Sequence, residues 1–192
     1  MGTTDAADEP RTPMGIVPTD GRGSMPFALL RNEPLVAIAS AALERAGVEL
    51  LDFDASWASV QEAGGPLVLH DPLCPLTPVG FLAETVAAAA KGDAVVVGVR
   101  PVTDTLKSVE AGVVGETVDR EGVWAVCSPV VLPAPVVATL DDVPDLDDLA
   151  ALVADLRARF PVTVVEAPPL ARRVDDESAL ALLDAFAELH PE

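Results

Sequence analysis

The segment Pro66-Leu-Val-Leu-His-Asp-Pro-Leu-Cys-Pro75, with the residues on either side of it, decides the fold. Its apolar run at residues 66–70 predicts a buried strand. Residues 77–91 predict a helix with Thr77 as its N-cap. The run Ala-Val-Val-Val-Gly-Val at residues 94–99 predicts another buried strand. A strand, a helix and a strand in this order indicate a βαβ unit.

The same alternation extends over the rest of the chain. Residues 15–18 predict a strand, which leads into a Gly-containing loop and then a helix at residues 35–46. Further strands are expected at residues 48–53, 123–131 and 162–166, and further helices at residues 54–63, 146–160 and 176–189. This order predicts a single α/β domain with a Rossmann-like, mainly parallel, twisted sheet that carries helices on both faces.

One segment departs from this alternation. Residues 108–118 alternate apolar and polar side chains around two glycines, which predicts a β-hairpin. We expect it to protrude from the sheet as an arm of about residues 107–124. Because a protruding hairpin has unpaired edges, we also expect it to contact a second copy in a homodimer. Residues 1–13 are predicted to be a disordered leader, and residues 14–192 the single domain.

Composition excludes several classes of partner. The chain has 31 acidic and 12 basic residues, a net charge of -19, so it would repel nucleic acids and anionic lipids. No apolar run approaches the ~20 residues that span a bilayer. Cys74 and Cys127 lack metal-site spacing and indicate reduced thiols in a cytoplasmic protein.

Polar residues follow two of the predicted strands. Ligands of open parallel sheets bind beyond the carboxyl ends of strands, where His70-Asp71 and Thr103-Asp-Thr105 are expected to lie. A carboxylate there can hold a divalent cation. The alternative is that Asp71 caps a turn before Pro72 and that His70 is a packed residue. Spacing alone favours this alternative.

In three ordered segments the chain resembles the 2-C-methyl-D-erythritol 4-phosphate cytidylyltransferases. These enzymes join CTP to a sugar-alcohol phosphate and release pyrophosphate in isoprenoid biosynthesis. The resemblance covers roughly residues 15–187. Its three segments are Val68-Leu-His-Asp-Pro-Leu-Cys-Pro-Leu76, Pro101-Val-Thr-Asp-Thr-Leu-Lys107 and Val118-Asp-Arg-Glu-Gly-Val-Trp-Ala-Val126.

The first segment carries the implied metal site. The family has a strand that ends in His-Asp-Ala-Ala-Arg-Pro, whose Asp contacts magnesium at the nucleotide phosphates. This chain has His70-Asp-Pro-Leu-Cys-Pro75 at that place. The resemblance therefore implies that Asp71 is a catalytic and metal-binding residue for Mg²⁺ if the protein is active, with Cys74 in place of the family's Arg.

Other matches imply a site for the phosphate of the acceptor. The family's Asp-Thr pair corresponds to Asp104-Thr105, and its Thr-Val-Asp-Arg segment to Thr117-Val-Asp-Arg120. The resemblance thus places Thr105 and Arg120 at the sugar phosphate. The family's Lys-Val-Thr corresponds to Arg173-Val-Asp175, which adds Arg173. Arg172 is the alternative if the register shifts by one residue.

The nucleotide loop departs from the family pattern, which reads Pro-Ala-Ala-Gly-x-Gly-x-Arg and, several residues later, Pro-Lys. This chain has Pro18-Thr-Asp-Gly-Arg-Gly-Ser24 followed directly by Met25-Pro-Phe27. The match implies that Gly21, Gly23 and Ser24 bind the nucleotide and that Arg22 serves as the catalytic cation. Phe27 stands where the catalytic Lys is expected, and Asp20 adds a negative charge.

Base recognition also departs from the family. Between Leu51 and Pro66 family members have an extra strand and a Gly-rich helix start that help to select cytosine, and this chain has only Asp54-Ala-Ser-Trp-Ala-Ser-Val60. The family's Gln-Thr-Pro-Gln segment corresponds to Cys127-Ser-Pro-Val130, without either Gln.

Three functions follow from these matches and departures. The first is a cytidylyltransferase that is weakly active or inactive. The second is a non-catalytic homologue that acts as a binding or regulatory subunit. The third is a different nucleotidyl or phosphosugar activity on the same scaffold.

Overall fold

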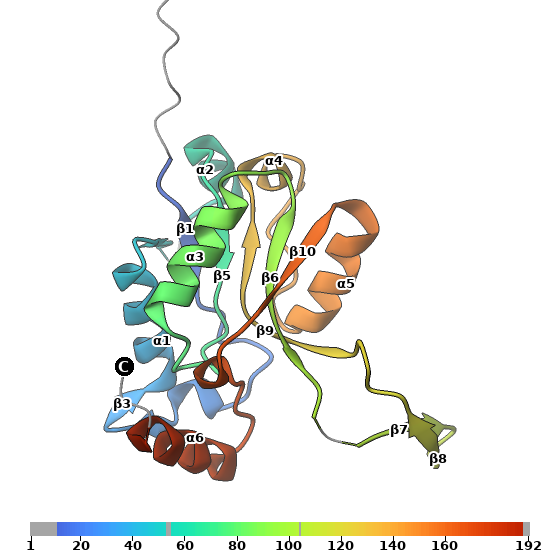
Figure 1. The fold of residues 1–192 in the computed structure, drawn as a ribbon. Coiled ribbons are helices and arrows are strands. Elements are labelled where there is room, and N and C mark those ends of the chain that lie inside the picture. The colour runs from blue at the N-terminus through green and yellow to red at the C-terminus, as the bar shows by residue number, and fades with distance from the viewer. Residues whose placement is uncertain (1–10, 53–54, 104, 190–192) are drawn as a thin grey trace, which may run out of the picture.

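A six-stranded twisted sheet lies at the centre of the computed structural model, which describes residues 11–52, 55–103 and 105–189 (Figure 1). The strands run in the order β10-β6-β9-β5-β1-β4. Their bounds are β1 (Met14–Ile16), β4 (Glu49–Leu50), β5 (Leu67–Leu69), β6 (Val95–Pro101), β9 (Trp124–Leu132) and β10 (Val162–Glu166). All neighbouring pairs are parallel except those of β9, which confirms the mainly parallel, Rossmann-like sheet.

Helices cover both faces of the sheet because successive side chains of a strand point to opposite faces. Leu67 and Leu69 belong to the core beneath α2 (Trp57–Ala63), α4 (Ala134–Val137) and α5 (Leu149–Arg159). Val68 belongs to the core beneath α1 (Leu35–Arg45) and α3 (Val79–Ala89). Each face therefore has an apolar layer of its own.

Strands β1, β5, β6 and β10 all run in the same direction. Their carboxyl ends therefore lie at one edge of the sheet. Helix α6 (Glu177–Leu189) packs at this edge on a cluster that includes Leu30, Leu35, Leu73 and Val174. Short elements join it there: η1 (Met25–Phe27), β2 (Leu29–Leu30), β3 (Glu33–Pro34) and η2 (Pro169–Ala171).

The predicted arm is confirmed as an antiparallel hairpin of β7 (Leu106–Glu110) and β8 (Val113–Val118). It projects away from the body in Figure 1. Every residue of β8 is exposed. Because the chain leaves the sheet on β6 and returns through the arm on β9, these two strands lie antiparallel to each other.

Several predicted boundaries were wrong. The strand expected at residues 48–53 is Glu49–Leu50 only, and Phe53 and Asp54 lie outside the described residues. Thr77 is not an N-cap, because its hydroxyl donates to the Cys74 carbonyl (2.8 Å) and α3 begins after Pro78. The helix expected from residue 146 begins at Leu149, after Asp148 accepts hydrogen bonds from two amides of its first turn.

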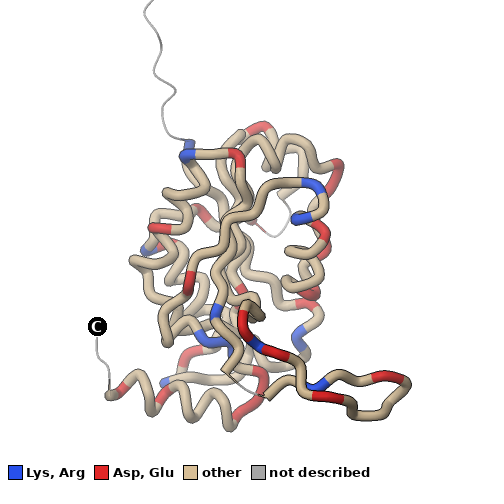
Figure 2. The backbone as a smooth tube through the Cα atoms, turned by 45° about the vertical axis from the view of Figure 1, so that its right-hand side comes forward, with Lys and Arg blue, Asp and Glu red and all other residues tan. Residues whose placement is uncertain are grey.

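The predicted leader is described only in part, since residues 1–10 lie outside the described residues. Arg11 donates to the Ala63 carbonyl (3.1 Å), and the Pro13 carbonyl accepts from the Glu49 amide (2.9 Å). These residues thus contact the domain. Figure 2 shows acidic residues spread over the body and the arm. Among the described residues, no helix combines the length and the apolar character needed to cross a membrane.

Candidate functional site

Asp71 lies at the carboxyl edge of the sheet, two residues after the end of β5. The His70 amide donates to the Ile16 carbonyl (3.0 Å), which continues the pairing of β5 with β1. The Asp71 carboxylate then accepts from the Leu73 amide through Oδ1 (3.0 Å). Asp71 therefore caps the turn before Pro72 and Leu73, as the alternative interpretation of the sequence expected.

Two arginines far apart in the sequence contact the same carboxylate. Arg22 Nε donates to Asp71 Oδ1 (2.9 Å), and Arg173 Nε donates to Asp71 Oδ2 (3.0 Å). The side chains of Arg22 and Asp71 are 2% and 6% exposed, whereas that of Arg173 is 43% exposed. These three residues form what we call the Asp71 cluster, with one buried and one accessible guanidinium.

The buried guanidinium of Arg22 donates one hydrogen bond from each of its three nitrogens. Besides Asp71, it donates from Nη1 to the Asp20 carbonyl (2.6 Å) and from Nη2 to the Leu146 carbonyl (2.8 Å). Sequence reasoning predicted that this residue would neutralise phosphate charge. In the structure the side chain instead joins the Gly loop, the turn after β5 and the segment before α5.

The Gly loop, residues 18–24, contains two glycines with a left-handed backbone. Gly21 (φ 71°) and Gly23 (φ 57°) both lie in the left-handed region, and Ser24 is exposed. Around Gly23 a side chain would meet open space. At Gly21, however, a Cβ would come within 2.8–3.0 Å of Asp147, so the loop and Asp147 are in close contact.

The segment 141–148, which we call the acidic segment, therefore borders the predicted nucleotide site. It contains five aspartates, Asp141, Asp142, Asp145, Asp147 and Asp148. Just before it, the Leu140 carbonyl accepts from Trp57 Nε1 (3.0 Å) and Gln61 Nε2 (2.9 Å). Together with the bond from Arg22 to Leu146, these contacts fix both ends of the segment. Sequence reasoning did not place these aspartates near the loop.

A pocket of about 530 Å³ lies between the carboxyl ends of β1 and β4, helix α2 and the acidic segment. Its described lining is mostly apolar and includes Val17, Leu51, Trp57 and Val143. Its charged members are Asp52 and Asp142, and no Lys or Arg is among the described lining residues. This pocket is therefore electrostatically unfavourable for a phosphate.

Ser128 is a site residue that sequence reasoning missed. Its Oγ accepts from the Asp71 amide (3.0 Å) and lies at hydrogen-bond distance from His70 Nδ1. Gly98 makes this placement possible, because a Cβ there would lie 2.9 Å from the Ser128 carbonyl oxygen. The match of Cys127-Ser-Pro to the family's Gln-Thr-Pro was the available signal for a hydroxyl at this position.

His70 is fully buried and uncharged at neutral pH. Burial lowers its pKa to about 4, although the Asp71 carboxylate opposes this shift. Its Nε2 has no hydrogen-bond partner among the described residues. Burial likewise raises the pKa of Cys127 to about 11 and that of Cys74 well above its ordinary value, so both remain thiols. The prediction that His70 is a packed residue is confirmed.

The residues expected to bind the sugar phosphate lie in two groups. Arg173 belongs to the Asp71 cluster. Thr105 and Arg120 lie at the base of the arm, where both are exposed and Arg120 Nη1 donates to the Thr103 carbonyl. Asp104 lies outside the described residues. Arg172 is exposed and makes no hydrogen bond or ion pair within the described part of the chain. No described contact joins the two groups.

The predicted magnesium ligand does not fit the ion in this arrangement. A carboxylate has about four acceptor positions. Three of those of Asp71 already receive the Arg22, Leu73 and Arg173 donors. Within residues 11–52, 55–103 and 105–189, no group of three His, Cys, Asp or Glu side chains is arranged to hold a metal. Mg²⁺ normally needs several oxygen ligands in octahedral geometry.

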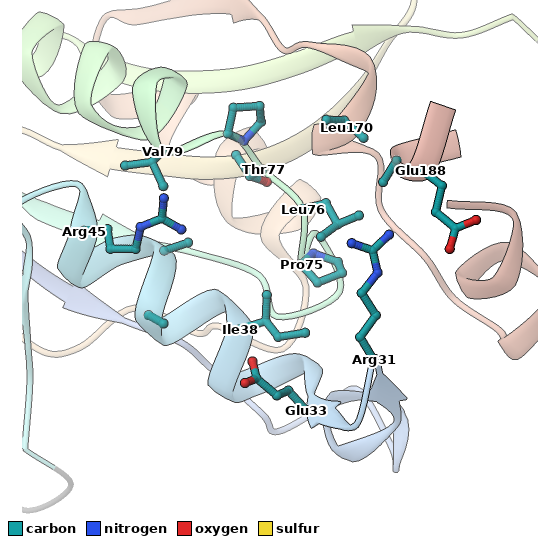
Figure 3. A pocket seen from close by; sticks show the side chains of 14 residues that line it. Arg31, Glu33, Ile38, Arg45, Pro75, Leu76, Thr77, Val79, Leu170 and Glu188 are labelled. Carbon is teal, nitrogen blue, oxygen red and sulfur yellow. The ribbon is translucent and has the colours of Figure 1, made fainter. Parts of the chain in front are cut away.

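A further pocket, of about 550 Å³, is lined by residues of α1, of the turn before α3 and of α6 (Figure 3). Pro75 and Leu76 of this turn form part of its wall, and Arg45 and Arg31 lie at opposite ends. Arg31 is engaged there by Asp184 (2.7 Å). The pocket contains none of the predicted site residues.

Comparison with known proteins gives consistent results. Residues 54–186 match the family model of 2-C-methyl-D-erythritol 4-phosphate cytidylyltransferase. The enzyme of that name from Nocardia farcinica is 37% identical over 150 residues, which is 74% of this chain and 64% of the relative. The one from Syntrophotalea carbinolica is 44% identical over 70 residues, 36% of this chain and 30% of the relative. The chain thus spans less than two thirds of these relatives.

Solved structures of the same enzymes share the fold. The structure from Thermus thermophilus has a TM-score of 0.63 at 23% identity and covers 92% of this chain and 98% of that chain. The one from Francisella tularensis has a TM-score of 0.63 at 13% identity, with 91% and 99% coverage.

Proposed function

Since the chain belongs to the 2-C-methyl-D-erythritol 4-phosphate cytidylyltransferase family, we propose that it binds a sugar-alcohol phosphate and transfers a cytidylyl group from CTP weakly or not at all. The observation that carries this proposal is the Asp71 cluster. It keeps an accessible guanidinium for the acceptor phosphate, whereas its carboxylate is bonded to arginines on both oxygens.

The acceptor half of the site rests on Arg173. Only its Nε is used by Asp71, so the two Nη groups of this half-exposed side chain can bind phosphate oxygens. Thr105 and Arg120 are the further ligands we propose. Because they lie on the arm, we propose that the arm of a second copy brings them to Arg173 in a homodimer.

The proposed dimer has support in the apolar surface of the arm. Val109, Val113 and Val114 are 64–70% exposed, and Trp124 at its base is 43% exposed. Such a concentration of large apolar side chains is typical of an association surface. We further propose a cytoplasmic location, which the two free thiols, Cys74 and Cys127, support.

The nucleotide half of the site opposes catalysis. At the position of the family's Lys, Phe27 presents a 60% exposed ring, which cannot donate to a phosphate oxygen. Each guanidinium nitrogen of Arg22 donates a hydrogen bond within the fold, and Asp147 packs against Gly21. Loss of one such donor to a developing oxyanion typically costs ~2.7–4 kcal/mol of transition-state stabilisation.

The test is pyrophosphate release from CTP and 2-C-methyl-D-erythritol 4-phosphate with magnesium. A family member with the intact loop serves as the positive control. We expect turnover at least about a hundredfold slower than that of the control. Comparable turnover would contradict the proposal and would mean that another cation, such as Arg22 after rearrangement, neutralises the triphosphate.

The alternative is a non-catalytic binding or regulatory subunit. It is favoured by the contact between Gly21 and Asp147, which places a carboxylate against the loop that would hold phosphates. Calorimetric titration separates the two functions. Binding of the sugar phosphate together with no detectable binding of CTP supports the alternative, whereas measurable CTP binding supports a slow enzyme.

A further inference from the structure

The Asp71 cluster carries a net positive charge without a metal ion. Arg22 and Arg173 each carry one positive charge and Asp71 one negative charge. The cluster therefore has a net charge of +1 around a carboxylate that is 6% exposed. A divalent cation next to it would be repelled by two guanidinium groups and attracted by one carboxylate.

The hydrogen bonds lead to the same conclusion. Asp71 Oδ1 accepts from Arg22 Nε and from the Leu73 amide, which uses both of its acceptor positions. Oδ2 accepts from Arg173 Nε and keeps one position. A cation would thus have a single lone pair, on the oxygen nearest to Arg173.

Arg22 cannot easily withdraw to make room. Its side chain is 2% exposed, and its other donors are held by the Asp20 and Leu146 carbonyls. Withdrawing it from Asp71 would disturb its bonds to its own loop, at Asp20, and to another segment, at Leu146. The guanidinium is therefore a fixed part of the fold.

We infer that Arg22 is a built-in counter-ion that replaces a divalent cation at Asp71, so that the cluster holds no metal ion and Arg173 offers its two Nη groups to a phosphate monoester. In this role Asp71 is a positioning residue. Its Oδ2 holds Arg173 Nε and thereby directs the two Nη groups to solvent. The inference deepens the proposed function and rests on it for the identity of the ligand.

The first experiment titrates the full chain with 2-C-methyl-D-erythritol 4-phosphate, in excess EDTA and in excess magnesium chloride. We expect dissociation constants that agree within about twofold. Binding that is about tenfold tighter or more with magnesium would overturn the inference. Because this comparison uses the unaltered protein, it does not depend on the folding of a variant.

The second experiment measures binding of Mn²⁺ alone by electron paramagnetic resonance. We expect the parent and Asp71→Asn to bind the same number of Mn²⁺ ions, because Asp71 holds none. Asn keeps the size of the side chain and one acceptor oxygen, and circular dichroism checks the fold. A Mn²⁺ signal in the parent that a folded Asp71→Asn abolishes would overturn the inference.

The two experiments separate this inference from the proposed function. Absence of phosphate binding in both buffers would refute the proposed function and, with it, the ligand named here. In that case the Mn²⁺ measurements still decide whether Asp71 holds a metal ion.

Discussion

The Asp71 cluster and the arm carry the two halves of the predicted phosphate site, but their surroundings differ. Both oxygens of Asp71 are bonded, and Arg22 beneath it is buried. The arm instead exposes every residue of β8, and its large apolar side chains have no covering layer. The cluster is thus stabilised within one chain, whereas the arm is suited to contact another molecule.

The difference indicates which side chains contribute most to the stability of the fold. A buried charge must be paired, so removing one member of the cluster leaves the others uncompensated. Replacing an exposed side chain on a hairpin changes the free energy of unfolding only slightly. We therefore expect substitutions in the cluster to act on folding and those in the arm to act on association and binding.

The largest effect is expected for Asp71→Ala. It leaves the buried Arg22 guanidinium without its counter-charge, which typically costs about 3–5 kcal/mol of unfolding free energy. Urea denaturation measures it. Asp184→Ala is the matched control, because the Arg31–Asp184 pair is 54% and 33% exposed and is expected to contribute less than about 1 kcal/mol. Equal losses of unfolding free energy in the two variants would contradict the expected difference between the buried and the exposed ion pair.

Acid should destabilise the protein through His70. Its pKa is about 4 in the folded state against 6.5 ordinarily, so the unfolded chain takes up the proton first. The stabilisation is complete above pH 6.5 and is lost as the pH falls towards 4, by about 3 kcal/mol in total. Urea denaturation across this pH range should show that the free energy of unfolding depends less steeply on pH in His70→Gln than in the parent. A slope unchanged by the substitution would assign the acid sensitivity to other groups.

In the arm, Arg120→Ala should weaken binding of 2-C-methyl-D-erythritol 4-phosphate by about tenfold, or ~1.4 kcal/mol, because a charge-assisted contact is lost. Lys107→Ala is the control. It removes another exposed arm cation, whose Nζ donates to Thr117 (2.7 Å), and should leave the affinity unchanged. Equal affinities of the parent and Arg120→Ala would exclude Arg120 from the site.

The smallest effect on folding is expected for Val114→Glu. The residue is 66% exposed, so the unfolding free energy of the single chain should change by about 0.5 kcal/mol or less. Sedimentation velocity at micromolar protein should nevertheless show loss of the dimer. Leu182→Glu, at a 57% exposed position on α6, should leave the dimer intact. A monomeric parent would rule out the association surface.

The sequence was sufficient to predict the helices and strands that have strong local patterns. The buried run before Asp71 and the helical spacing of Leu149, Leu152 and Leu156 both predicted the elements that the structure contains. The prediction for residues 48–53 was less accurate. The sequence of one strand does not specify its neighbouring strand and so does not fix how many of its residues pair. Only Glu49 and Leu50 pair with β1.

The site was harder to predict because its contacts are long-range. Sequence spacing says nothing about a bond between Arg22 and Asp71, which are 49 residues apart, or between Arg173 and Asp71, 102 residues apart. Asp147 has no local feature that indicates contact with Gly21. The family resemblance identified Asp71 and Arg173 as members of a site, but it did not reveal that they pair with each other.

The positions of the two tryptophans make these regions separately observable by fluorescence. The chain has two Trp and no Tyr, so its ultraviolet emission comes almost entirely from Trp57 and Trp124. Trp57 donates to the Leu140 carbonyl beside the acidic segment, and Trp124 lies at the base of the arm. Replacing either one by Phe leaves a single intrinsic reporter, one for the nucleotide loop and one for the arm. Ligand entry and subunit association can thus be followed independently in an unlabelled protein.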